Sequence, residues 1–184
     1  MSIPPGTYRL GPADGTLSVR TGRTGAAAMA GHNLLFHVTK WEATLAVAGD
    51  PAATTLQLSA DGGSLSVIEG TGGMQALGDD DKADIEKTID DDVLKRQGVT
   101  FASSAVSPSA DGSGLTVQGD LTLRGTAHPL TFDITFDGAK LRGSAVIKQS
   151  DWKIKPYSAL FGALKVVDEV EVSIDATLPA AQSV

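Results

Sequence analysis

Three histidines, His32, His37 and His128, are the residues of this chain best suited to acid–base or metal chemistry. The first two follow the small residues of the segment TGRTGAAAMAGHNLLFHV, residues 21–38. An odd number of positions separates them, so along an unbroken strand they would face opposite sides of a sheet. A metal site needs three or more converging ligands. We therefore predict no metal site, and we keep His32 alone as a polar candidate at the end of a barrel.

The same segment does not fit a nucleotide-binding loop. Such a loop needs glycines followed by a lysine and a serine or threonine at a helix start. Here Ala26 follows Gly25, and the next lysine is Lys40. The aspartate runs lack the spacing of a calcium loop, the chain has no nucleophile elbow, and it has no cysteine. We predict no catalytic residues and no enzyme, although a hydrolase or isomerase using His32 with nearby carboxylates remains an alternative.

The composition restricts the partners. The 184 residues include 15 Lys and Arg against 22 Asp and Glu, a net charge of −7. This balance predicts no nucleic-acid binding and disfavours electrostatic docking to anionic lipid. No apolar run approaches the roughly 20 residues that cross a bilayer, so we expect no stable membrane insertion. The first residues, MSIPPGTYRLGPADG, lack a secretory signal, which predicts a cytoplasmic protein, or a periplasmic or secreted one if a signal has been removed.

Alternation with a period of two residues dominates the chain. In PLTFDITFDG, residues 129–138, and in EVEVSIDATL, residues 169–178, apolar side chains fall on one face and polar ones on the other. Such half-buried strands are typical of antiparallel sheets. The segment 33–48 changes phase near Thr39, which we interpret as a bulge within one bent strand. Ten or so short strands separated by turn residues predict an all-β fold, a closed barrel or a sandwich, in one domain over residues 1–184.

One segment breaks this pattern. DDDKADIEKTIDDDVLKRQG, residues 79–98, places Ile85, Ile89 and Val93 on a single helical stripe. We predict one amphipathic helix, inserted near residues 80–96, against the end or side of the barrel.

The apolar face of the sheet is the remaining candidate site. An interior of about eight strands is either filled by side chains or leaves room for one slender ligand. Alternation alone does not decide between these. The side chains from which a lining would come are Phe36, Trp41, Leu121, Leu123, Phe132, Ile134, Phe136, Ile147, Trp152, Phe161, Val172 and Ile174.

Several short motifs occur in an order that resembles the YceI-like domain family. They are Phe101–Ser103, GDLTLRG at residues 119–125, PLTF at residues 129–132, SDWKI at residues 150–154 and VDEV at residues 167–170. Gly31-His32 stands where the family carries an early histidine, whereas Lys153 replaces a family glycine. The resemblance implies a bacterial, lipocalin-like antiparallel barrel of about eight strands with a long lumen, and a possible homodimer.

The resemblance also implies a function. We predict a non-catalytic carrier whose partner is an apolar small molecule, a polyisoprenoid, quinone-like or other lipid-like chain, with no other cofactor. The alternative is a ligand-free barrel with a packed interior that acts as an interaction, assembly or stress-related module.

Overall fold

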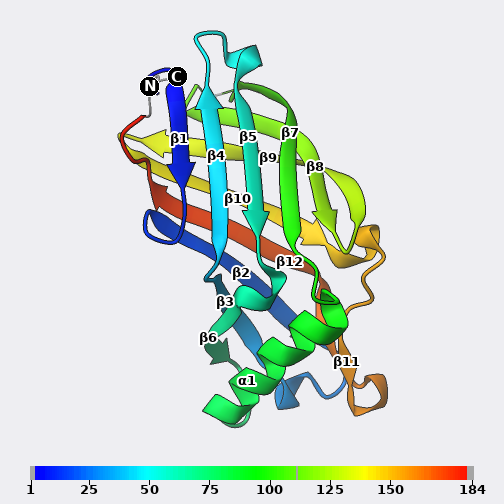
Figure 1. Ribbon diagram of the computed structural model, residues 1–184. Helices are drawn as coiled ribbons and strands as arrows, with labels where there is room; N and C mark the ends of the chain where they lie inside the picture. The colour runs from blue at the N-terminus through cyan, green and yellow to red at the C-terminus, as the bar shows by residue number, and fades with distance from the viewer. Residues whose placement is uncertain (1–2, 111, 182–184) are drawn as a thin grey trace.

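The computed structural model describes residues 3–110 and 112–181, which form one curled antiparallel sheet with a single α-helix beside it (Figure 1). The elements in chain order are β1 (Gly6–Leu10), β2 (Gly15–Thr24), η1 (Ala28–Ala30), β3 (Asn33–Val38), β4 (Trp41–Val47), η2 (Pro51–Ala53), β5 (Thr55–Ala60), η3 (Gly62–Ser64), β6 (Leu65–Thr71), α1 (Asp79–Thr88), η4 (Ile89–Val93), β7 (Val99–Pro108), β8 (Gly114–Leu123), β9 (Thr126–Asp137), β10 (Lys140–Lys148), η5 (Gln149–Trp152), β11 (Ser158–Ala159), η6 (Leu160–Gly162) and β12 (Leu164–Thr177). The all-β, antiparallel prediction is confirmed.

The strand count and the closure differ from the prediction. Eleven strands follow one hydrogen-bonded path, β1-β4-β5-β7-β8-β9-β10-β12-β2-β3-β6, and the short β11 pairs with β12. Within the described residues, no pairing joins β1 to β6. The sheet is therefore a curled half-barrel with two free edges, and the expected closed barrel of about eight strands is not what forms.

The phase change near Thr39 accounts for one of the additional strands. Residues 33–48 form two strands rather than one bulged strand: β3 pairs with β2 and β6, whereas β4 pairs with β1 and β5. The chain crosses from one edge of the sheet to the other at Thr39 and Lys40, and it crosses again through residues 61–64. The buried Ser64 joins the two crossings, because Thr39 N donates to Ser64 O at 2.9 Å and Lys40 N donates to Ser64 Oγ at 3.1 Å.

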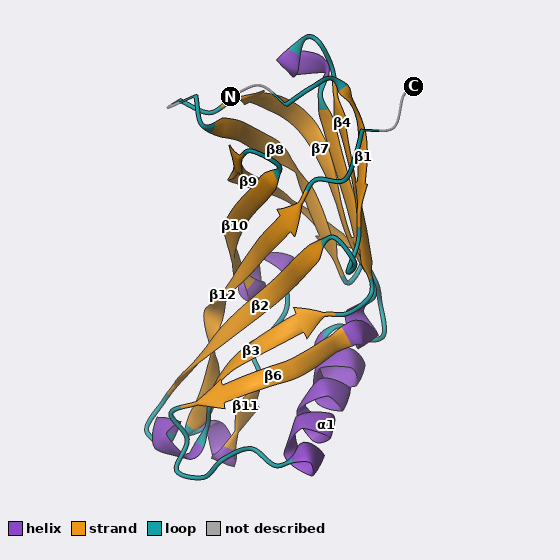
Figure 2. Ribbon diagram, turned by 90° about the vertical axis from the view of Figure 1, so that its left-hand side faces the viewer, coloured by secondary structure: helices purple, strands orange, loops and turns teal. Residues whose placement is uncertain are grey.

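The predicted alternation is confirmed along β9, and along residues 169–177 of β12 except at Ser173, which is half-buried and lines the cavity. Leu130, Phe132, Ile134 and Phe136 are buried or half-buried, while the residues between them are exposed. At the end of the sheet near both termini the interior is solid, with side chains that pack into one hydrophobic core: Tyr8, Val106, Val117, Phe136 and Ala176. The opposite end is bounded by α1 and by the connections after β2, β6 and η5 (Figure 2). We call this the open end.

The predicted helix near residues 80–96 is present as α1, which continues into the π-helical turn η4. Glu86 fastens α1 to the edge strand β6, where its Oε1 accepts hydrogen bonds from Val67 N at 2.7 Å and Ser66 Oγ at 3.1 Å. A helix thus covers the polar backbone of one free sheet edge. No helix among the described residues has the length and apolar character needed to span a membrane.

Candidate functional site

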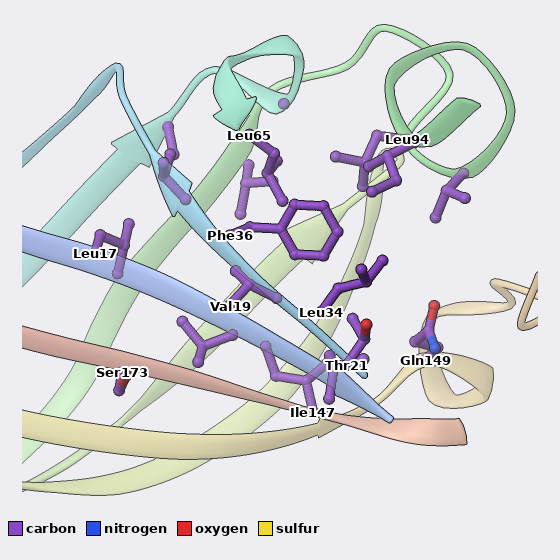
Figure 3. Close-up of a pocket in the computed structure, with 18 of the residues that line it drawn as sticks. Leu17, Val19, Thr21, Leu34, Phe36, Leu65, Leu94, Ile147, Gln149 and Ser173 are labelled. Carbon is purple, nitrogen blue, oxygen red and sulfur yellow. The ribbon is translucent and has the colours of Figure 1, made fainter. Parts of the chain in front are cut away.

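A large apolar cavity lies within the curl of the sheet and reaches the open end. Its volume is about 920 Å³, and most of its wall consists of aliphatic and aromatic side chains from the inward faces of the strands. Figure 3 shows Val19, Leu34, Phe36 and Ile147 around this space, with Leu94 from the end of the helical segment. Sites that bind small organic molecules have volumes of about 300–1,000 Å³, so this cavity is at the large end of that range.

The structure brings eight of the twelve candidate lining residues together around the cavity. They come from β3, β8, β9, β10 and β12, and they are Phe36, Leu121, Leu123, Phe132, Ile134, Ile147, Val172 and Ile174. Phe132 packs edge-on against Phe101, with ring centroids 5.3 Å apart. The wall is therefore assembled from residues that are more than a hundred positions apart in the chain.

Two candidates, Phe136 and Trp41, face inward and are buried but do not line the cavity. Phe136 lies near the end of β9, in the packed end of the sheet. Trp41 is the first residue of β4, at the end of this strand away from the termini, and it is buried. Its Nε1–H has no hydrogen-bond partner within the described part of the chain. Neither side chain lines the cavity, although Ala43 and Leu45 of β4 do. Alternation gives the face of a residue but not its position along the barrel, which is what excludes Phe136.

Trp152 is part of the wall itself. β9 and β10 pair only from Lys140–Asp137 to Ser144–Asp133. Beyond that point β9 pairs with β8 alone, so the two strands separate. The turn η5 follows β10, and from it Trp152 donates its Nε1–H to Leu121 O at 2.7 Å and places its ring 4.9 Å from that of His128. Trp152 therefore fills the gap in the sheet rather than lining the cavity.

Phe161 points away from the protein. Its relative exposure is 112%, and it lies in η6, where Leu160, Phe161 and Gly162 all have positive φ angles of 50°, 54° and 88°. A left-handed conformation costs a residue with a side chain about 1–2 kcal/mol. A period-two pattern does not apply in this tight turn, so the prediction that Phe161 faces the lumen is wrong.

Lys153 also adopts the left-handed conformation, with φ 59° and ψ 26°, and it ends η5. This is the position at which the YceI-like motif carries a glycine, the residue that reaches such angles without steric cost. Lys153 therefore replaces the family glycine while keeping the left-handed turn of the backbone.

Polar groups gather at the open end of the cavity. Thr21 and Arg23 extend the inward face of β2, and Gln149 extends that of β10. Gln149 is buried and donates its Nε2–H to Val167 O at 3.1 Å. The guanidinium of Arg23 donates to Gly31 O at 2.6 Å and also to Ala28 O. These residues were not among the predicted site residues, although each continues the inward face of an alternating strand.

His32 lies at this open end, as expected for the polar candidate, and it lines the cavity. Its Nε2 is 2.7 Å from Gln75 O, and its ring packs where a side chain on Gly73 would have to sit. The residue thus joins the start of β3 to the connection between β6 and α1. The segment of glycines and alanines before it is a connection between strands, in which Gly25, with φ 103°, lies directly against Ala163 O.

The apolar stripe of the helical segment faces the cavity. Ile85, Ile89 and Val93, predicted to share one face, all line it together with Leu94. The helix therefore supplies one side of the open end, which agrees with the predicted position against the end or side of the barrel.

The end of this helical segment carries a testable pH dependence. Asp91 accepts hydrogen bonds from Arg96 Nε at 2.6 Å and Lys87 Nζ at 2.5 Å. These cations, Arg96 foremost, lower the pKa of the Asp91 carboxyl from 3.8 to about 2. The folded-state pKa lies below the unfolded one, so the stabilisation is complete above the unfolded value and is lost as the pH falls through about 2.

We expect an NMR titration of the Asp91 side-chain carboxyl to give a midpoint near 2, and a higher midpoint in Arg96→Gln. Equal midpoints in the two proteins would contradict the assigned hydrogen bond. Lys140→Gln, which removes a cation that bonds to Thr177 on β12, is the control.

A curled antiparallel sheet around one apolar cavity defines a barrel-type fold suited to binding apolar ligands. Among the described residues, no group of three or more His, Asp or Glu side chains could hold a metal ion. The chain belongs to the YceI-like domain family, which matches residues 8–178. This confirms the resemblance inferred from the short motifs.

Two solved structures illustrate the fold. The chain is 20% identical to BcnA of Burkholderia cenocepacia, with a TM-score of 0.63 over 88% of this chain and 94% of that one. It is 16% identical to a YCEI protein of Campylobacter jejuni, with a TM-score of 0.52 over 77% of this chain and 82% of that one. No curated protein matches the sequence.

Proposed function

We propose that this protein is a non-catalytic carrier that holds a long apolar molecule, a polyisoprenoid or similar lipid, in the cavity. The observation that carries the proposal is the unfilled interior of about 920 Å³ with its largely aliphatic wall. An interior of this size is not explained by packing alone, because protein cores normally contain few voids larger than a water molecule.

The distribution of polar groups supports one orientation of the ligand. The solid core closes one end of the cavity, whereas Thr21, Arg23 and Gln149 lie at the open end. A chain inserted with its hydrocarbon toward the core would place a polar head near these three residues. Each buried methylene contributes about 0.8 kcal/mol before the cost of ordering the ligand, so a long chain can bind without a charged anchor.

The carboxyls whose pKa values are lowered, those of Asp91, Asp168 and Asp175, bond to neighbouring Arg, Lys or Ser side chains and do not line the cavity. These shifts therefore reflect contacts that hold the fold together. The homodimer that the resemblance implies stays a prediction.

The test is mass spectrometry of organic extracts from protein purified from its own host. We expect a long-chain lipid in about equimolar amount, and we expect delipidated protein to bind a polyprenol again in a fluorescence titration. Absence of both an extracted lipid and polyprenol binding would contradict the carrier function and favour the ligand-free interaction module.

A further inference from the structure

A buried polar side chain lines the cavity at the open end. Three polar residues are buried among the described residues, Thr54, Ser64 and Gln149, and of these three Gln149 borders the cavity. It is 9% exposed and lies at the end of β10 (Figure 3). A buried amide is unfavourable unless its donor and its acceptor both find partners. The partner that Gln149 lacks within the protein therefore indicates what a ligand supplies.

The amide of Gln149 leaves its oxygen free. Its Nε2 donates to Val167 O at 3.1 Å, and because a backbone carbonyl can only accept, this bond fixes which end of the amide faces β12. Within the described part of the chain, no group donates to Gln149 Oε1. Of the side chains described, Trp41 Nε1 is the one fully enclosed polar atom without a partner. Oε1 is thus accessible, and the cavity is the space that it borders.

A free hydroxyl lies across β12 from this amide. Thr21 of β2 pairs with Val170 of β12, and Ile147 of β10 pairs with Val170 from the other side. Gln149 follows Ile147 by two residues and bonds to Val167, so Thr21 and Gln149 flank one short stretch of β12 (Figure 3). Thr21 lines the cavity, and its hydroxyl bonds to no other described residue. Two strand spacings, about 10 Å, separate β2 from β10, which leaves room for one small head group between these side chains.

Charge does not select the head group. The charged side chains around the cavity are three carboxylates, those of Asp61, Asp81 and Asp84, and two cations, Arg23 and Lys165. The guanidinium of Arg23 already donates to two backbone carbonyls in the connection before β3. A carboxylate or phosphate head would therefore gain no net attraction, and the hydrogen-bonding groups of the wall decide the selection.

We propose that Gln149 and Thr21 recognise a neutral hydroxyl group at the end of the apolar ligand, so that the protein selects a long-chain alcohol. This inference rests on the carrier function proposed above. The hydroxyl donates a hydrogen bond to Gln149 Oε1 and accepts one from Thr21 Oγ1, since a hydroxyl has one donor and two lone pairs. An ether, ester or ketone oxygen accepts from Thr21 but leaves Oε1 unpaired. An ammonium group donates to Oε1 but cannot accept from Thr21.

The test compares four ligands that share a geranylgeranyl chain and differ in the head group. Geranylgeraniol, its methyl ether, geranylgeranoic acid and geranylgeranylamine are each used to displace the neutral fluorophore N-phenyl-1-naphthylamine from the delipidated full chain. We expect the alcohol to bind about tenfold more tightly than the methyl ether, because the ether leaves Gln149 Oε1 unpaired in a site without water. The acid and the amine should also bind more weakly than the alcohol, since each loses the hydration of its charge.

Two variants separate the roles of the two residues. Gln149→Leu should reduce the preference for the alcohol over the ether from about tenfold to about one. Thr21→Val removes a donor that the alcohol and the ether both use, so it should weaken both by about three- to tenfold and leave their ratio unchanged. The matched control is Ser173→Ala, which removes a hydroxyl from the same cavity wall. Ser173 pairs with Ser144, five residues before Gln149 and roughly 15 Å away, so this variant should bind as the wild type does.

Equal affinity of the wild type for the alcohol and the ether would overturn the hydroxyl assignment and leave the carrier function standing. Tighter binding of the acid or the amine would do the same, as would a preference that survives in Gln149→Leu or disappears in Ser173→Ala. If none of the four ligands displaces the fluorophore from the wild type, the carrier function fails as well. Circular dichroism checks that each variant is folded. If Gln149→Leu is not, because Val167 O has lost its donor, the wild-type ligand series and Thr21→Val decide the question.

Discussion

Val172→Asp is expected to abolish binding of the apolar ligand while the protein stays folded. Val172 lies midway along β12, faces the cavity and is half-buried. A carboxylate there would lose its hydration when an apolar chain enters, without gaining a partner. We expect the dissociation constant for a polyprenol to rise at least about 100-fold, which corresponds to about 2.7 kcal/mol.

The matched control is the same substitution on the outer face. Val146 lies in β10, the strand that pairs with β12, and its side chain is 61% exposed. Val146→Asp should bind the ligand as tightly as the wild type. Fluorescence titration measures both affinities, and circular dichroism confirms that both variants are folded. Wild-type affinity in Val172→Asp would show that the ligand does not occupy this cavity.

Trp152→Ala is expected to cause the largest loss of stability. The side chain is only 3% exposed, and it fills the gap between β9 and β10 with a hydrogen bond to Leu121 O and a ring contact to His128. Truncation of a buried tryptophan costs about 3–5 kcal/mol. For a chain of this length, that lowers the thermal midpoint by about 6–20 °C.

Trp152→Phe separates packing from hydrogen bonding. It keeps an aromatic ring in the gap but leaves Leu121 O without the indole donor, which costs about 1–2 kcal/mol. Chemical denaturation should rank the three proteins as wild type, Trp152→Phe and Trp152→Ala in order of decreasing stability. If Trp152→Ala is no less stable than Trp152→Phe, the ring does not hold the wall together.

The sequence was sufficient to predict which face of a strand is inward. In β9 and β12 each side chain's face follows from the two-residue period of its own strand, so Phe132 and Val172 could be predicted without knowledge of the fold. The helix could be predicted in the same way from Ile85, Ile89 and Val93. The inward face of a strand and the apolar stripe of a helix can both be predicted because each depends only on residues close together in the sequence.

Strand partners and position along the barrel could not be predicted in this way. The phase change at Thr39 fits both a bulge and a crossing between sheet edges, and only the partners of β3 and β4 distinguish the two. Likewise Phe132 and Phe136 share one face of β9, yet one lines the cavity and the other lies in solid core. The outward direction of Phe161 depends on a left-handed turn, a conformation that nothing in the sequence predicts at a phenylalanine.

The place of β12 in the sheet has a consequence for how the protein is made. This last strand lies between β2 and β10, so β2 must wait for a partner that leaves the ribosome about 140 residues later. At cellular rates of translation that interval lasts roughly 7–28 s. Throughout it the edge of β2 that pairs with β12 has no partner, which makes the nascent chain a substrate for chaperones until its final segment emerges.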